Sequence, residues 1–91
     1  MFRRGRRRRL GPLEVITLPN DAGLARLGLV IPKRAVRRAV RRNLIRRWAR
    51  EAFRQRQHSL PARDIVLRVH AAAVSRAEVD AVFDGLAEVL P

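Results

Sequence analysis

The chain is organised around one basic segment, Ala39-Val40-Arg41-Arg42-Asn43-Leu44-Ile45-Arg46-Arg47-Trp48-Ala49-Arg50-Glu51. Continued to residue 54 and wound as an α-helix, at about 100° per residue, it separates into two faces. The polar face carries Arg42, Asn43, Arg46, Arg47, Arg50 and Arg54. The apolar face carries Leu44, Ile45, Trp48, Ala49 and Ala52, whereas Arg41 and Phe53 fit neither face.

A face made of arginine cannot hold such a helix in place, because like charges one turn apart repel each other. The apolar face must therefore pack on a core, where we also expect Trp48. The basic face can be a solvated surface, but its one-sided clustering favours contact with the phosphates of a nucleic acid.

The charge of the chain is concentrated in the same region. Of a net charge of +13 over 91 residues, residues 1–32 carry +5, residues 33–56 carry +10 and residues 57–91 carry −2. Such a field attracts nucleic acid. Arginine makes up 20 of the 21 basic residues, which suits RNA contacts, although a GC-rich genome would also favour arginine codons.

The sequence predicts one small α+β domain over residues 1–91. Residues 1–9 form a basic arm, expected to be disordered or to order on a polyanion. Strands are expected over 13–18 and 24–31, joined as an antiparallel hairpin, and over 64–70. A helix runs to about Gln57, and a capping box of Ser75 and Glu78 starts another. The expected order is β-β-α-β-α.

The residues offer little chemistry of their own. There are no cysteines, and His58 and His70 are the only histidines, so neither a catalytic residue nor a metal site is expected in the protein. Apolar runs are too short to span a membrane, and no secretory signal is present. We therefore expect a cytoplasmic protein with no membrane partner.

Two blocks of sequence resemble the protein subunit of bacterial ribonuclease P. The first is Arg26-Leu27-Gly28-Leu29-Val30-Ile31-Pro32-Lys33-Arg34, and the second is the segment from Ala39 to Arg54. The likeness extends from about Leu13 to Leu90. It implies a small α-β sandwich with a left-handed crossover at the motif helix, and an RNA subunit that performs the catalysis with Mg²⁺ and removes the 5′ leader of precursor tRNA.

The resemblance also implies partners and sites. The partners would be the catalytic RNA subunit, in a 1:1 complex with a protein monomer, and precursor tRNA; the protein alone would bind no cofactor. RNA contacts are expected from Arg42, Asn43, Arg46, Arg47, Arg50, Arg54, Lys33, Arg34, Arg37 and Arg38. A cleft on the sheet would receive the leader, with Phe2, Val30 and Arg68 as weaker candidates.

Two departures from the family pattern stand out. The motif is most often Arg-Asn-Arg, whereas here its third position is Leu44. Residues 1–5 resemble the end of the family's first helix, so most of that helix, one wall of the leader cleft, would be missing. Either the start codon is assigned too late, which is our hypothesis, or the protein is a natural minimal form.

Other function classes stay open from the sequence alone. A small ribosomal-protein-like RNA-binding module with no associated nuclease is the main alternative. A basic DNA-binding or architectural protein would bind duplex DNA as tightly as structured RNA. A protein-only nuclease is disfavoured because the chain has few carboxylates and histidines.

Overall fold

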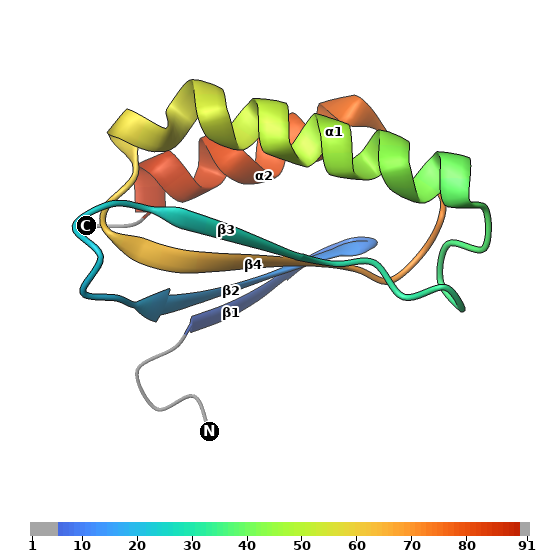
Figure 1. Cartoon of the computed structure of the whole chain (residues 1–91), viewed down its shortest axis with the longest axis horizontal. Helices are drawn as coiled ribbons and strands as arrows, with labels where there is room; N and C mark the ends of the chain where they lie inside the picture. Colours follow the sequence, from blue (N-terminus) through green and yellow to red (C-terminus); the bar gives the residue numbers. More distant parts are fainter. Residues whose placement is uncertain (1–5, 90–91) are drawn as a thin grey trace.

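A four-stranded sheet and two helices form two layers, with both helices on one face of the sheet (Figure 1). The structure is a computed structural model and describes residues 6–89. Its elements are β1 (Arg6–Leu10), β2 (Leu13–Pro19), β3 (Arg26–Val30), α1 (Ala39–Arg56), the 3-10 turn η1 (Gln57–Ser59), β4 (Arg63–Val69) and α2 (Arg76–Val89). The expected β-β-α-β-α order is present as β2-β3-α1-β4-α2, with β1 added before it.

The strand order β1-β2-β4-β3 corrects the predicted hairpin. β2 and β3 do not pair, because β4 lies between them, antiparallel to β2 and parallel to β3. Alternate residues of β4, Ile65, Leu67 and Val69, are almost fully buried. A strand this apolar gains most from the centre of the sheet, and a local turn signal between β2 and β3 cannot reveal a third strand from later in the chain.

The basic arm is also corrected for residues 6–9, which form most of β1 and pair antiparallel with β2. The turn between them places Gly11 at φ 58°, a conformation that favours glycine. Arg7 forms an ion pair of 3.0 Å with Glu14 on β2. An edge strand tolerates, and often carries, such charged residues. Residues 1–5 lie outside the described part of the chain.

The core fills the space between the sheet and the helices. Ile45, Ala49 and Ala52 of α1 are buried there, as the two-faced pattern predicts. Phe53, which fitted neither face, packs edge-to-face on the fully buried Phe83 of α2, with ring centroids 6.3 Å apart. Its position is therefore explained by the second helix.

Local contacts fix how α1 and α2 are placed. The capping box is confirmed, since Ser75 Oγ accepts from the Glu78 N–H (3.1 Å) and the Glu78 carboxylate accepts from the Ser75 N–H (2.9 Å). Arg56 at the end of α1 forms an ion pair of 2.6 Å with Asp84 of α2.

α1 lies in the crossover between the parallel strands β3 and β4. The left-handed sense of this crossover stays a prediction.

Candidate nucleic-acid interface

The basic face of α1 forms a continuous arginine strip, which we define as Asn43, Arg46, Arg47, Arg50 and Arg54. These side chains, with Glu51, line a shallow hollow of about 530 Å³. Asn43, Arg47, Arg50 and Arg54 are exposed, and Arg46 is half-buried. The structure thus brings together five of the six polar-face residues that the sequence predicted.

Hydrogen bonds orient the strip and its neighbouring loop. Arg46 Nη1 donates to Asn43 Oδ1 (3.1 Å), so Asn43 helps to hold one guanidinium. Arg42, the sixth residue, is half-buried and turns the other way: its Nη1 donates to the carbonyls of Val36 and Arg37, both at 2.9 Å. Arg42 therefore ties the preceding loop to α1, and direct RNA contact by it stays a prediction.

The loop before α1 presents four more cations. Lys33, Arg34, Arg37 and Arg38 are exposed, while Val36 between them is 1% exposed and anchors the loop in the core. The N–H groups of Ala35 and Val36 both donate to the Pro32 carbonyl at 3.0 Å, which folds the loop into a compact turn. The four cations are therefore presented by an ordered loop at the start of the helix.

The first turn of α1 adds to this positive surface. Arg38 stands at the N-cap position and makes no side-chain capping hydrogen bond, and the first turn contains no acidic residue. The N-terminal end of a helix carries a partial positive charge from its N–H groups. Here no carboxylate of that turn offsets this charge.

Arg41 makes a structural contact that the sequence reasoning missed. Its guanidinium donates to the carbonyl of Ala72, at 3.2 Å from Nε and 3.0 Å from Nη2, and also to that of Val74. The same group lies 5.3 Å from the centroid of the Trp48 ring. Arg41 thus fixes α1 to the loop before α2, and its misfit on the helical pattern was the available signal. Trp48 packs on the core as expected.

The sheet face opposite the helices brings two leader candidates together. Val30 of β3 and Arg68 of β4 are partners in the parallel register, so their side chains lie on the same face. Val30 is 40% exposed, and Arg68 is half-buried, with its Nε lacking a hydrogen-bond partner within residues 6–89. Phe2, the third candidate, lies outside the described residues.

The same face holds an ion cluster centred on Glu14. Its carboxylate lies 2.8 Å from His70 Nε2 and 3.0 Å from Arg7 Nε. The hydrogen bond from His70, with the charge of Arg7, holds the pKa of Glu14 below its ordinary value despite partial burial. His70 therefore has a structural partner, while His58 is exposed on η1.

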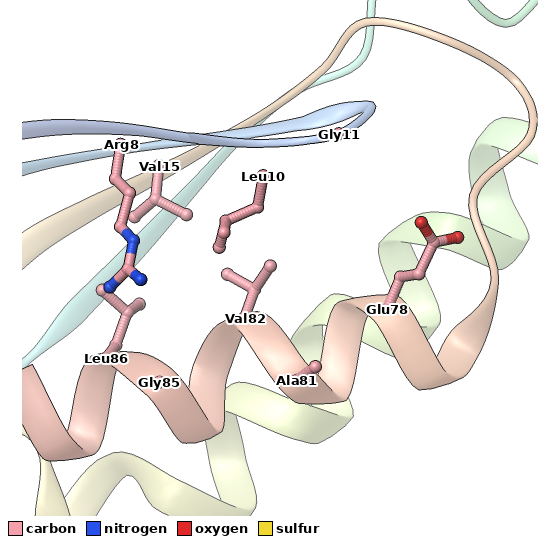
Figure 2. A pocket seen from close by; sticks show the side chains of 9 residues that line it. All are labelled: Arg8, Leu10, Gly11, Val15, Glu78, Ala81, Val82, Gly85 and Leu86. Atoms are coloured by element: carbon pink, nitrogen blue, oxygen red, sulfur yellow. The ribbon is translucent and has the colours of Figure 1, made fainter.

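Other surfaces offer less chemistry. Within residues 6–89 no group of three or more His, Cys, Asp or Glu side chains gathers. Across the same residues, neither helix has the length and apolarity needed to cross a membrane. Figure 2 shows a hollow of about 360 Å³ between the β1–β2 hairpin and α2, lined mainly by apolar side chains such as Leu10, Val82 and Leu86, with Arg8 and Glu78 at its rim.

Comparison with known proteins points to one family. A family model described as Ribonuclease P matches residues 1–90. The ribonuclease P protein component of Bordetella parapertussis is 49% identical over 73 residues, which cover 69% of this chain and 59% of that protein. The component of Salmonella arizonae is 56% identical over 48 residues, covering 53% of this chain and 40% of that protein. The match thus spans less than two thirds of either relative.

Solved structures agree with the fold. The ribonuclease P protein of Thermotoga maritima superposes with a TM-score of 0.81 at 26% identity, covering 97% of this chain and 89% of that one. The Staphylococcus aureus protein gives a TM-score of 0.79 at 24% identity, covering 93% and 80%, and at this identity shows the fold alone. The α+β sandwich expected from the sequence is therefore confirmed.

Proposed function

The chain belongs to the Ribonuclease P family, and from that premise we propose that it is the RNA-binding protein subunit of ribonuclease P. In this role it assists a catalytic RNA that removes the 5′ leader from precursor tRNA by endonucleolytic hydrolysis. The observation that carries the proposal is the arginine strip of α1, displayed on the outside of a helix whose other face is buried.

The strip suits a phosphate backbone for physical reasons. Guanidinium groups donate in pairs to phosphate oxygens and stay charged at any physiological pH. Four arginines on one helical face repel each other in the protein alone, and neutralising them on RNA removes that repulsion. The loop cations Lys33, Arg34, Arg37 and Arg38 extend the same contact toward the start of α1.

Hydrolysis is assigned to the RNA rather than to the protein. In the complex that we propose, the catalytic Mg²⁺ ions would reside with the RNA subunit, as membership of the family implies. The protein contributes positioning: the strip to the RNA subunit, and the sheet face around Val30 and Arg68 to the leader. One protein monomer would pair with one RNA in the cytoplasm.

A multiple-turnover cleavage assay tests the proposal. Precursor tRNA is incubated at low magnesium with the ribonuclease P RNA, in the presence and absence of the protein. We expect the protein to restore cleavage and to show no cleavage by itself. Cleavage by the protein alone, or no binding of the RNA subunit, would refute the proposal.

The runner-up, a small ribosomal-protein-like module with no associated nuclease, makes a different prediction. Such a protein would co-purify with ribosomal subunits and leave the cleavage assay unchanged. The family match and the Bordetella and Salmonella relatives favour the ribonuclease P subunit over this alternative.

A further inference from the structure

An apolar hollow lies beside the arginine strip at the start of α1. It has a volume of about 560 Å³, within the range of small-ligand sites. Its lining comprises Arg34, Ala35, Val36, Arg37, Arg38, Val40, Arg41, Leu44 and Ala72. Among its larger apolar side chains, Val36 is buried, whereas Val40 is exposed and Leu44 is half-buried, so these two can meet a ligand.

Val40 and Leu44 are unusual for the helix that carries them. Val40 is 79% exposed, the most exposed large apolar side chain among the described residues. Leu44 was predicted to pack on the core, but it is only half-buried and does not join the core cluster. One turn apart on α1, the two side chains form a single apolar step. Exposure of these apolar side chains to water is unfavourable, and a flat apolar partner would remove their surface from water.

The charge around this step selects the kind of partner. Four arginines contribute to the lining and no acidic residue does. Arg34, Arg37 and Arg38 are exposed, whereas Arg41 is engaged with carbonyls and Trp48. A ligand that fits must combine an apolar surface with negative charge, as an unpaired nucleotide does through its base and its phosphates.

The step is also continuous with the strip. On a helix, residues three and four apart are neighbours, so Val40 adjoins Asn43 and Leu44 adjoins Arg47. An RNA strand lying along the strip reaches the hollow without leaving the surface of α1. This continuity favours RNA over an acidic peptide as the occupant.

We propose that the hollow receives one unpaired base of the bound RNA, seated on Val40 and Leu44, with its flanking phosphates held by Arg34, Arg37 and Arg38. The proposal deepens the proposed function and rests on it. It gives the protein a contact with the base itself, beyond the phosphate contacts of the strip.

The test compares two RNA probes that differ only in their bases. One is hexariboadenylate, and the other is a hexamer with the same ribose–phosphate backbone but no bases. Binding is followed by fluorescence anisotropy and by the emission of Trp48, the only tryptophan of the chain, whose ring lies under Arg41 at the wall of the hollow. We expect about a tenfold preference for the base-containing hexamer, from apolar area covered on the step.

Uncharged substitutions of Val40 and Leu44 separate the contribution of the apolar step to RNA binding from that of the surrounding charges. Val40→Gln and Leu44→Gln should each reduce the preference, and the double variant should abolish it, with the salt dependence unchanged. Leu24→Gln, at a residue 50% exposed in the loop between β2 and β3, is the matched control and should keep the full preference. Val40→Phe should increase the preference, because it enlarges the apolar step.

The outcomes are distinct. An equal affinity of the wild type for both hexamers, a full preference retained by Val40→Gln, or displacement of labelled hexariboadenylate by hexaglutamate as readily as by unlabelled hexariboadenylate would overturn the base site. Because Val40 is so exposed, Val40→Gln tests the idea even where Leu44→Gln fails to fold. Failure of the wild type to bind the ribonuclease P RNA would instead overturn the proposed function.

Discussion

Replacing Arg46 and Arg47 with alanine removes two guanidinium groups from the arginine strip, and its effect on RNA binding can be worked out in advance. The two residues contribute to the hollow on the outer face of α1 and do not belong to the core cluster. Arg46→Ala removes the hydrogen bond from Arg46 to Asn43. Pairs of charges one turn apart are worth about 0.2–0.5 kcal/mol each, so the melting temperature should change little.

The magnitude follows from counterion release. If the bound protein neutralises about six phosphates, the slope of log K against log salt is about −5.4 with the coefficient for duplex DNA, and the variant, which neutralises about four, should show about −3.6. Between 50 and 200 mM salt the wild type would then lose about 2,000-fold in affinity and the variant about 150-fold. The variant binds more weakly at low salt, and the two curves converge as salt rises.

The assay is a titration of the ribonuclease P RNA by filter binding over a salt series. Arg9→Ala is the control for charge, because Arg9 lies on β1 opposite Glu14 in the antiparallel register, on the sheet face away from α1, and its side chain donates to the Gly11 carbonyl. An unchanged slope in the double variant would refute the assignment of the strip to phosphate. Equal flattening per charge by Arg9→Ala would show that net charge, rather than the strip, controls binding.

Three further predictions concern stability. Ser75→Ala removes half of the capping box and should lower the stability by about 1 kcal/mol, measured as a fall in Tm, whereas Ser75→Asp should retain most of it. Phe83→Ala empties a site in the core that is 0% exposed and should cost about 3–5 kcal/mol in chemical denaturation; a cost as small as that of a surface substitution would contradict the packing. Hydrogen bonds from Arg26 and Asn20 hold the pKa of Asp64 below its ordinary 3.8. The ionised carboxylate therefore contributes to folding stability above that pH, and this contribution is lost as the pH falls through the lowered pKa. Asp64→Asn should therefore lower Tm at pH 7 and shrink the loss of Tm on acidification, and an unchanged acid profile would contradict this.

The helices and their faces were largely predictable because their signals are local. The alternation of apolar and basic residues in α1 and the Ser75–Glu78 box each lie within a few turns of chain. The buried positions Ile45, Ala49 and Ala52 follow directly from that pattern. For the same reason the five members of the strip could be placed on one surface before any coordinates.

The strand pairings could not be predicted, because they depend on residues far apart in the chain. Asn20 and Arg26, which flank the loop between β2 and β3, both bind Asp64 at the start of β4. Those contacts bridge 44 and 38 residues, and they hold β4 in the place that a local hairpin would have given to β3. β1 was missed because a run of arginines carries no β signal until Glu14 and the turn at Gly11 are considered.

Leu44 and Arg41 show the limit of a helical pattern. The pattern indicates on which side of the helix a side chain lies, but not which groups of a neighbouring loop it will meet there. Arg41 finds backbone carbonyls on the loop before α2, whereas Leu44 finds the lining of a hollow shared with Arg37 and Arg38. Each position depends on a loop whose path is set by tertiary contacts, so neither could be assigned from the sequence.

The central place of β4 has a consequence for synthesis of the protein. A chain emerges from the ribosome N-terminal end first, at about 5–20 residues per second. Residues 1–56, with +5 from the first 32 and +10 from the rest, carry +15, and they are complete before the strand that joins β2 to β3 has been made. Until β4 has been synthesised, the growing chain is a polycation whose sheet is incomplete. It emerges close to ribosomal RNA. During synthesis, binding of this basic segment to ribosomal RNA therefore competes with its pairing to β4.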